Sequence, residues 1–407
     1  METTSGSAAV WRAPGDATDG DRQPSTPTPA SPSAPASPPA AASSPVPPPP
    51  VPTPPPPPAP AASPPSPAAL APHSSPALSK LAAAEPSPAP SELAPAEASP
   101  APSELAPAAK PSPAAWGWRG RVNRLAHVSL PASQSELAHR AARKRLLRPF
   151  GRSMTIVVAN PKGGAGKTPT ALLAAATLGF YRGGYSLAWD NNETRGTLGM
   201  RAESTDHQRT VVDLLVHADE FLTGDAGAGT LSRFLRPQTA RFDVLASDEA
   251  PGGMDVIDDA AFGKLWKALS RYYRTLVVDT GNNVRAPNWQ AAVKRADCVI
   301  VPTTVAPDVA DSGLWMLDHL DRNGHADLTR NAVAVVSCAD PRTDQALLDK
   351  IVTAYRARVA HVVVVPHDPY IRTGGRIEYD RLTDESRRAW LFVCTAVVEA
   401  LALRDKA

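Results

Sequence analysis

The segment around residues 160–168 limits the folds open to this chain more strongly than any other. It reads Asn-Pro-Lys-Gly-Gly-Ala-Gly-Lys-Thr, follows the apolar run Thr155–Ala159 and precedes the Ala/Leu-rich stretch Thr170–Phe180. A strand, a glycine-rich loop and a helix in this order are the setting of a phosphate-binding loop. Glycines let backbone N–H groups turn toward an anion, and the N-terminus of the following helix adds partial positive charge. The segment therefore predicts a site for nucleotide phosphates.

The residue types in this loop have separate expected roles. The Lys167 side chain is expected to reach the β- and γ-phosphates, and the Thr168 hydroxyl is expected to ligate Mg²⁺. The backbone of four residues is expected to surround the phosphates: Gly163, Gly164, Ala165 and Gly166.

The loop departs from the common G-x-x-x-x-G-K-[ST] pattern, because Pro161 stands at the first glycine position and a second lysine, Lys162, precedes the glycines. This arrangement resembles the deviant P-loop of the ParA/MinD family of dimeric ATPases. The resemblance implies ATP and Mg²⁺ as cofactors and a homodimer held together by ATP, in which Lys162 reaches the nucleotide of the partner subunit. Hydrolysis of the γ-phosphate then releases the dimer, so the protein acts as a nucleotide switch.

The next predicted strand ends at Asp190, which is followed by Asn192 and Glu193. ParA/MinD proteins have Asp-x-Asp here, so Asp190 matches the first aspartate and Asn192 stands in the place of the second. The resemblance implies that both positions serve catalysis and that Asp190 lies near Mg²⁺. An amide cannot accept a proton as a carboxylate does. We therefore expect slow hydrolysis, or substitution of the missing carboxylate by Glu193.

A third element is the apolar run Thr275–Val278, which delivers Asp279 at a spacing of 112 residues from Lys167. Four apolar residues followed by an aspartate are typical of a Walker B strand, whose carboxylate holds Mg²⁺. The predicted metal ligands are therefore Thr168, Asp190 and Asp279. The residues after Asp279 are Thr-Gly-Asn-Asn, whereas the family commonly has Thr-Pro-Pro or a similar run.

A fourth element follows the last predicted strand, where Pro366 and Asp368 resemble the I-P-x-D segment that lies near the nucleotide base in this family. Cys338 occupies a position at which the family often has an asparagine for adenine. Pro169 follows Thr168 directly and fits the first turn of a helix, but it lacks the N–H that often binds the α-phosphate. Some loss of nucleotide affinity is therefore expected.

From Thr155 onward, β-type runs alternate with helix-type segments, which predicts a mostly parallel, twisted sheet with helices on both faces. In this α/β architecture ligands bind at the carboxyl ends of the strands, where all four elements fall. The predicted strands are Thr155–Ala159, Ser186–Trp189, Phe242–Ala246, Thr275–Val278, Cys298–Val301, Asn331–Val336 and His361–Val365. The predicted helices are Pro169–Arg182, Ala260–Tyr273, Pro287–Arg295, Asp308–Leu320, Asp344–Arg356 and Thr383–Leu403.

The chain ahead of this domain has a different composition. Of its 46 prolines, 34 lie before residue 114, among alanine and serine. Such a segment buries too little apolar surface to offset its ordering entropy, so residues 1–115 are expected to be a disordered Pro/Ala/Ser-rich tail. A 12-residue repeat, Ser87–Ala98 and Ser99–Lys110, lies within it. The tail either docks a proline-recognising protein partner or serves as a spacer, or its repeat is a replication product without function.

Charge is unevenly distributed along the chain, although the total is only +2. The net charge is −4 over residues 1–115, +8 over residues 116–152 and −2 over residues 153–407. We call residues 116–152 the basic collar. Within it, Ser133-x-x-Glu136 predicts a capping box that opens a helix ending before Pro149. The collar either meets a membrane surface, nucleic acid or an acidic partner, or carries a solvated helix that lies on the ATPase domain of residues 153–407.

Other features narrow the class of protein. The three cysteines, Cys298, Cys338 and Cys394, lie in separate apolar runs and are expected to be small core residues. The sequence shows no signal-peptide pattern and no transmembrane segment, so we expect a cytoplasmic protein that acts either in the cytoplasm or peripherally at the inner face of the membrane. The last helix is apolar nearly all round and is expected to be buried.

Four functions are compatible with these features. The chain is similar in layout to the proline-rich MinD-like proteins associated with actinobacterial type VII secretion, which implies a regulatory or positioning ATPase acting on a large secretion or division machine. The alternatives are a chromosome or plasmid partition ATPase that binds DNA nonspecifically, a nucleotide-sensing scaffold without hydrolysis, and a metabolic relative. The near-neutral charge of residues 153–407 argues against DNA binding by the domain itself.

Overall fold

The computed structural model describes residues 10–11, 113–193, 196–203, 208–248, 257–372 and 374–404. By its contacts the chain divides into one unit of residues 1–17 and 109–407 and a second unit of residues 18–108, of which none is described. The tail that was expected to be disordered therefore lies almost entirely outside the described residues, and so does its 12-residue repeat. The described part of the tail ahead of residue 113 is Val10–Trp11, and there the backbone is an extended, paired strand, contrary to the expectation for these two residues.

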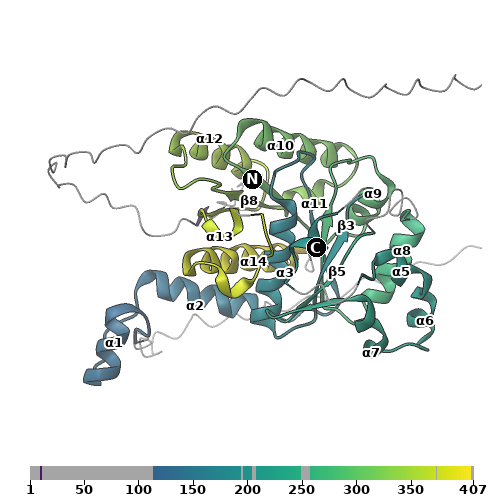
Figure 1. Ribbon diagram of the computed structural model, residues 1–407. Helices are drawn as coiled ribbons and strands as arrows, with labels where there is room; N and C mark the ends of the chain where they lie inside the picture. Colours follow the sequence, from purple (N-terminus) through teal and green to yellow (C-terminus); the bar gives the residue numbers. More distant parts are fainter. Residues whose placement is uncertain are drawn as a thin grey trace, which may run out of the picture. The chain divides into compact units, whose positions relative to one another are not determined.

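The described residues contain one sheet of nine strands in the order β1-β9-β8-β7-β2-β6-β3-β5-β4 (Figure 1). Its neighbouring strands pair in parallel, except for β4 and β5, which are antiparallel. The strands are β1 Val10–Trp11, β2 Met154–Val158, β3 Ser186–Asn191, β4 Arg236–Gln238, β5 Phe242–Leu245, β6 Thr275–Thr280, β7 Cys298–Thr304, β8 Val333–Ser337 and β9 His361–Val365. The mostly parallel sheet predicted from the sequence is confirmed, and all seven predicted strands are present.

The strands are buried on both faces because successive side chains enter two different cores. Val157 and Leu187 belong to one core, whereas the neighbouring Ile156 and Ala188 belong to the other. Period-two alternation of this kind is the geometry of a strand, and burial on both sides explains why these runs are apolar throughout.

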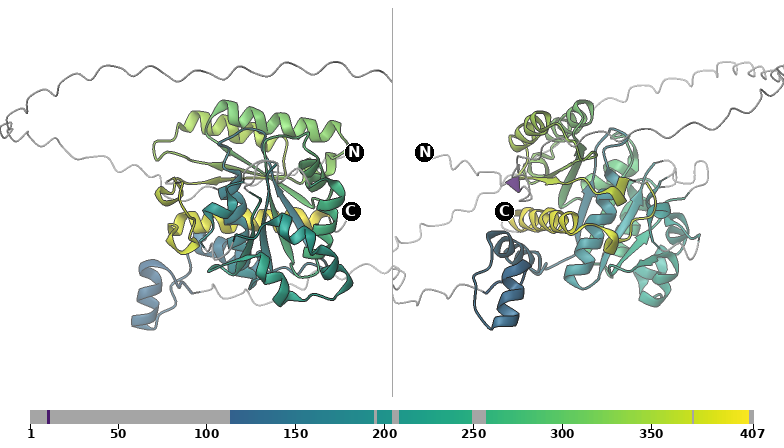
Figure 2. Two further views of the ribbon diagram at one scale, coloured as in Figure 1. Left: turned by 45° about the vertical axis from the view of Figure 1, so that its right-hand side comes forward. Right: turned by 60° about the vertical axis from the view of Figure 1, so that its left-hand side comes forward.

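Helices cover both faces of the sheet, as predicted (Figure 2). One core lies under α8 Asp259–Leu269, α9 Pro287–Lys294, α10 Pro307–Arg322 and α12 Gln345–Arg356. The other lies under α3 Lys167–Arg182 and α14 Asp384–Arg404. The remaining helices on the sheet are short: α4 Leu198–Arg201, α5 Val211–Val216, α6 Ala218–Thr223, α7 Ala228–Leu231, α11 Ala326–Arg330 and α13 Pro369–Arg372, with 3₁₀ turns η1 Ser232–Phe234 and η3 Tyr379–Arg381.

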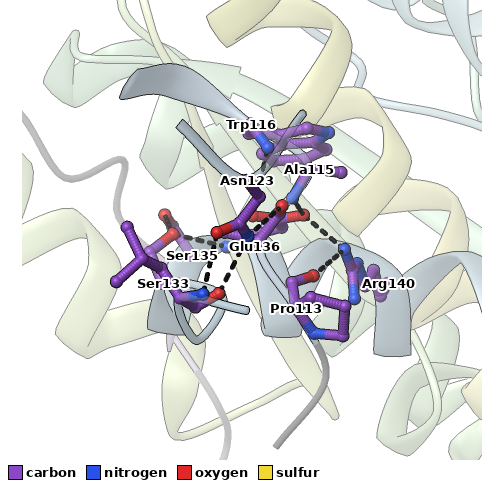
Figure 3. Close-up of polar contacts among 10 residues, drawn as sticks. Pro113, Ala115, Trp116, Asn123, Ser133, Ser135, Glu136 and Arg140 are labelled. Carbon is purple, nitrogen blue, oxygen red and sulfur yellow. Dashed lines mark hydrogen bonds and ion pairs between the residues drawn. The ribbon is translucent and has the colours of Figure 1, made fainter. Parts of the chain in front are cut away.

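Ahead of the sheet, α1 Gly117–Ala126 and α2 Gln134–Leu146 form what we call the N-terminal hairpin, residues 113–146 (Figure 3). The Ser133 hydroxyl accepts a hydrogen bond from the Glu136 N–H, which confirms the predicted helix start. The Glu136 carboxylate, however, does not complete the expected capping box. It is 1% exposed and accepts from the N–H groups of Ala115 at 2.8 Å and Trp116 at 3.4 Å, and from Arg140 at 2.6 Å. The glutamate of the predicted capping box thus binds the backbone of Ala115 and Trp116, directly before α1.

The α2 helix packs against α14. It therefore lies on the domain, which is one of the two interpretations of the collar given by the sequence. Ala142 and Leu146 are buried in the core shared with α14. The Thr395 hydroxyl donates to the Ala142 carbonyl at 3.2 Å, and Arg145 pairs with Glu399 at 3.0 Å. Residues 134–146 are therefore held to residues 384–404 by both apolar and polar contacts.

The C-terminal helix α14 is buried over most of its surface, as its all-round apolar sequence predicted. Its core residues include Trp390, Val393 and Leu401. Cys394 on this helix and Cys298 on β7 are also buried, as expected, whereas Cys338 is only partly buried and lines a cavity described below. Among the described helices, none has the length and hydropathy needed to cross a membrane.

Candidate functional site

The register of the sheet brings the predicted site residues of three strands to one edge. Asp190 at the end of β3 is the Cα partner of Asp279 on β6, and Asp279 is in turn the partner of Val158 at the end of β2. The glycine-rich loop leaves β2 directly after this point. Because β2, β3 and β6 run in parallel, their carboxyl ends meet where ligands bind in open α/β sheets.

The loop has the backbone that its glycines allow. Gly164 and Gly166 have φ of 78° and 86°, a left-handed conformation that other residues rarely adopt, and Gly166 is the N-cap of α3. Helix α3 then begins at Lys167, so its first backbone N–H groups and its partial positive charge face the loop. This is the anion-binding arrangement that the sequence predicted.

The Lys167 ammonium group lies over the loop. It donates to the carbonyl oxygens of Asn160 at 2.9 Å and Lys162 at 3.2 Å, and to the side-chain oxygen of Asn282 at 2.6 Å. Burial lowers the pKa of Lys167, while the negative charges of Asp279 and Glu193 raise it. The lysine therefore connects the loop with the segment that follows β6.

The geometry at Asp279 fits a divalent cation. One carboxylate oxygen, Oδ2, accepts from the Thr168 hydroxyl at 2.7 Å, and the other, Oδ1, is buried and has no hydrogen-bond partner among the described residues. Burial raises the pKa of Asp279, and the negative charge of Asp190 raises it further. A buried carboxylate with a free oxygen beside a hydroxyl is a donor set suited to Mg²⁺, which takes one or two protein oxygens and completes its shell with water and phosphate.

Asp190 is buried next to Asp279, but its two oxygens accept backbone hydrogen bonds. Oδ1 accepts from the Asn192 N–H at 3.3 Å and Oδ2 from the Leu198 N–H at 3.2 Å. Burial raises the pKa of Asp190, and these hydrogen bonds oppose the rise. A Cβ atom at Gly196 would overlap the Asp190 carboxylate, which explains why glycine stands there. Asp190 thus shapes the loop after β3, and its direct role toward Mg²⁺ stays a prediction.

The Glu193 side chain lies against the segment that follows β6. Its Oε1 accepts from the backbone N–H groups of Asn282 and Asn283, both at 3.0 Å, while Oε2 is buried without a hydrogen-bond partner among the described residues. A Cβ atom at Gly281 would overlap this carboxylate. The Gly-Asn-Asn run after Asp279, which departs from the family pattern, therefore makes room for Glu193. Asn192, next to it, is partly buried.

Lys162 lies apart from this cluster. Its ammonium group pairs with Asp308 of α10 at 3.0 Å, and both side chains are about half exposed or more, at 49% and 62%. The two lysines of the loop therefore differ: Lys167 is turned into the site of its own chain, while Lys162 is held at the surface.

Pro366 and Asp368 lie at a cavity of about 160 Å³ beside the loop. Its lining includes Pro169, Cys338 and Trp390 as well. The Nε1 atom of Trp390 and the Nε2 atom of His367, another lining residue, are buried without hydrogen-bond partners in the part of the chain that is described. The cavity therefore combines apolar walls with two polar atoms that a ligand could satisfy.

The Asp368 carboxylate is used within the fold. It accepts from the Tyr370 N–H at 3.0 Å and from the N–H and hydroxyl of Thr383, which precedes α14, at 3.0 and 3.1 Å. Burial alone would raise the pKa of Asp368, but these bonds and one from Ser386 lower it below its usual value. Asp368 thus fixes the cavity wall and the start of α14.

The fold and the glycine-rich loop define a P-loop NTPase-like α/β protein. No protein-family model matches the chain. Among curated proteins, the ESX-1 secretion-associated protein EspI from two strains of Mycobacterium tuberculosis is 27% identical over 283 residues, which are 69% of this chain and 42% of the relative. The chain thus spans less than half the length of these relatives.

Solved structures similar to this chain include ParA and MinD ATPases and the cobyrinic acid a,c-diamide synthase of Mycobacterium smegmatis. The cell division ATPase MinD of Pyrococcus furiosus is 18% identical and covers 62% of this chain and 99% of its own, with a TM-score of 0.45. A ParA family ATPase from Chlorobium tepidum is 16% identical with the same coverages and a TM-score of 0.47. MinD of Pyrococcus horikoshii, complexed with Mg-ADP, is 19% identical and covers 60% of this chain and 94% of its own, with a TM-score of 0.45. The sequence analysis noted a resemblance to ParA/MinD ATPases and to proteins associated with type VII secretion. Proteins of both kinds are among those similar to this chain.

Proposed function

We propose that this chain is an ATP- and Mg²⁺-binding switch of the ParA/MinD type that controls a large secretion machine. The observation that carries the proposal is the Asp279 carboxylate. It is buried, bonded on one oxygen to Thr168 of the glycine-rich loop and free on the other. A carboxylate in this position is suited to a divalent cation, and the adjacent loop supplies the backbone N–H groups that bind phosphate.

The residues around Asp279 divide the work of binding. Thr168 and Asp279 would hold Mg²⁺, which would neutralise charge on the nucleotide phosphates. Lys167 exchanges its present acceptors, Asn160, Lys162 and Asn282, for the β- and γ-phosphates. The cavity of about 160 Å³ next to Gly166 takes the base, and its Trp390 and His367 nitrogens meet the polar edge of the ring. Pro169 contributes to this cavity wall, although it provides no N–H.

Movement of Lys167 is the physical basis of the switch. In the present state Lys167 bonds to Asn282, and the backbone of Asn282 and Asn283 bonds to Glu193. When Lys167 turns to the γ-phosphate, it releases Asn282, so the segment after β6 can be reordered around the phosphate. Ordering of such a segment by a γ-phosphate and its reversal on hydrolysis is a known switching mode.

Lys162 is proposed to act across a dimer. Its ion pair with Asp308 is exposed to solvent, and such pairs contribute little to stability. The lysine can therefore leave Asp308 for the phosphates of a second subunit at little cost. ATP then holds two copies together, and loss of the γ-phosphate separates them.

A nucleotide sensor that does not hydrolyse ATP is the second candidate, because Asn192 replaces a carboxylate of the family pattern. Glu193 is the nearby carboxylate with a free oxygen, so it is the group available to orient a water molecule. Rapid phosphate release that depends on Glu193 supports the ATPase, and tight ATP binding without release supports the sensor.

The proposed partner is a protein of the secretion machinery, since the curated relatives are described as ESX-1 secretion-associated. Contact through the Pro-rich tail, and contact of the collar with a membrane surface or nucleic acid, belong to the same proposal. The division into a tail of residues 1–115, a collar of residues 116–152 and an ATPase domain of residues 153–407 likewise stays a proposal.

The test is the oligomeric state of the full chain by light scattering, with Mg-ATP, with Mg-ADP and without nucleotide. We expect a dimer with Mg-ATP alone. Lys162→Ala should bind ATP and stay monomeric, whereas Lys167→Ala should lose ATP binding by a factor of about 100 or more, since a charge-assisted contact to phosphate is removed. Lys264→Ala is the matched control, because Lys264 forms a surface ion pair with Asp219 far from the loop in sequence.

Three results would contradict parts of the proposal. If the wild-type chain binds Mg-ATP and remains monomeric, the cross-subunit role of Lys162 is wrong. If it binds no nucleotide at Mg-ATP concentrations of millimolar order, the whole assignment fails. If Lys264→Ala has the same effect as Lys162→Ala, the dimer depends on surface charge in general and not on the loop.

A further inference from the structure

A cationic cavity lies away from the glycine-rich loop, where the N-terminal hairpin meets the domain. Its volume is about 620 Å³, within the range of small-molecule sites. Residues of α1 and α2 form one side, and residues of α3, η3 and α14 form the other. None of the lining residues belongs to the loop of residues 160–168 or to the base cavity, so this is a separate site.

Positive charge dominates the lining. Four arginines line it: Arg121, Arg124, Arg387 and Arg388. The lining has one carboxylate, Asp384, which pairs with Arg387 at 2.6 Å. The other three arginines form no ion pair with a described carboxylate, so three guanidinium groups around one cavity remain available to an anion.

Aromatic side chains provide the rest of the wall. Trp116 and Phe180 are 38% and 47% exposed, which is unusual for rings of this size, and both line the cavity. Tyr379 also lines the cavity, although its side chain is almost fully buried. Its ring packs against that of Phe180, with ring centroids 5.4 Å apart.

His139 also lines the cavity, and its pKa reflects the charges around it. Burial lowers the pKa of His139, and the charges of Arg388 and Arg143 lower it further, while the negative charge of Glu136 opposes the shift. The imidazole also contacts Trp116 edge to face, with ring centroids 4.5 Å apart. The cavity is therefore a place where positive charge is poorly compensated in the ligand-free chain.

We infer that this cavity binds an organic phosphate, a phosphate ester whose apolar or aromatic part lies against Trp116 and Phe180. Guanidinium groups bind phosphate oxygens by paired, charge-assisted hydrogen bonds, and aromatic rings accept the attached organic group. The same chemistry fits two sources, a free phosphate ester such as a nucleotide and the headgroup of an anionic phospholipid. Because the hairpin and α14 both line the cavity, ligand binding joins the collar to the ATPase domain.

The first arm of the experiment uses phenyl phosphate, the smallest probe with both parts, and isothermal titration calorimetry. The full chain carries Lys167→Ala in every sample, so that the glycine-rich loop does not compete for phosphate. We expect Arg121→Ala and Arg388→Ala each to weaken binding about tenfold or more, since each removes a charge-assisted contact. Arg119→Ala is the matched control, because Arg119 lies on the same helix, carries the same charge and does not line the cavity.

The second arm uses sedimentation with vesicles of phosphatidylcholine alone and vesicles that contain 30% phosphatidylglycerol, about the proportion at which an anionic surface attracts basic segments. Binding to the anionic vesicles that falls in Arg121→Ala and Arg388→Ala, but not in Arg119→Ala, identifies a lipid headgroup as the source. Binding of phenyl phosphate in solution with the same pattern of variants identifies a free ester.

Two outcomes overturn the inference. One is equal loss in Arg119→Ala and the cavity variants, which would show attraction to net charge only. The other is absence of binding in both arms, or binding of a poly-glutamate peptide that phenyl phosphate does not displace, which would assign the cavity to an acidic protein. Circular dichroism of each variant checks that the fold is retained, and Arg388→Lys should restore part of the affinity.

Discussion

At the scale of single residues, the paired aspartates at the ends of β3 and β6 form the proposed metal site and also lower the stability of the metal-free chain. Asp190 and Asp279 are neighbours in register, and each is almost fully buried. Burial of a like-charged pair is unfavourable, and it raises the pKa of both carboxyl groups. A cation next to Asp279 relieves this strain, so the stability of the chain and its affinity for Mg²⁺ are linked.

We therefore predict that Asp279→Asn stabilises the chain in the absence of Mg²⁺ at pH 8, by about 2 kcal/mol, while it abolishes stabilisation by Mg-ATP. Because the folded-state pKa of Asp279 is raised, the folded chain holds a proton that the unfolded chain loses at lower pH. Stability contributed by this group is present in acid and is lost as pH rises through the folded pKa. The difference between wild type and variant should thus disappear near pH 4, as measured by thermal unfolding.

Asp311→Asn is the control for this prediction, since Asp311 lies exposed on α10. It should change neither the unfolding temperature nor its dependence on Mg-ATP. A lower stability of Asp279→Asn at pH 8 without Mg²⁺ would show that the hydrogen bond from Thr168 outweighs the buried charge.

At the scale of elements, the long helices and the parallel strands were predictable because their signals are local. Apolar runs bounded by polar residues mark β2 and β6, and period-3.6 patterns mark α10 and α12. The short helices α4 to α7 were missed, since four to six residues are too few to show a period. Strand β4 contains Pro237 and pairs only at the sheet edge, so its sequence did not indicate a strand.

The same contrast holds for the candidate site. Lys167, Thr168 and Asp279 were predicted from spacing, and the structure brings them together. Glu193 contacts the Asn282 and Asn283 backbone across 89 and 90 residues of sequence, and no local pattern gives such a contact. A weak signal existed in Gly281, the residue whose missing Cβ makes room for the carboxylate.

The Glu136 carboxylate provides a prediction at this scale. Burial alone would raise its pKa, but the Ala115 and Trp116 N–H groups and Arg140 lower it, so the contribution to stability is lost as pH falls through the folded pKa. Glu136→Ala removes the acceptor of these partly exposed donors and should cost about 0.5–1.5 kcal/mol of local stability. Hydrogen exchange of the Ala115 and Trp116 amides should accelerate accordingly.

Ser135→Ala is the matched control, because Ser135 is an exposed neighbour on the same turn. Its exchange rates at residues 113–126 should equal those of the wild type. Unchanged protection in Glu136→Ala would mean that the apolar contacts of α1 and α2, and not the carboxylate, hold the N-terminal hairpin closed.

At the scale of the whole molecule, the boundary between collar and ATPase domain is where composition and packing disagree. The charge pattern places the boundary near residue 152, since the excess of basic over acidic residues ends there. The core does not end there, because Ala142 and Leu146 of α2 are buried with α14. Arg182 of α3 also donates to the carbonyl oxygens of Leu146 and Arg148. The packing thus makes α2 a part of the domain, even though its sequence reads as a charged linker.

This packing predicts how truncation affects stability. A chain that begins at residue 153 loses the Leu146 side chain from the core and exposes the α14 surface beneath α2, which should cost about 2–5 kcal/mol, the range for removal of a buried leucine side chain. A chain that begins at residue 113 keeps these contacts, although it lacks strand β1, and should unfold much closer to the temperature of the full chain than the shorter chain does. In between, Leu146→Ala in the full chain should reproduce most of the loss, while Leu147→Ala, at a neighbouring position that is 49% exposed, should have little effect. Thermal unfolding of the four chains measures this, and equal stability of the chains that begin at residues 113 and 153 would place the boundary where the charge pattern has it.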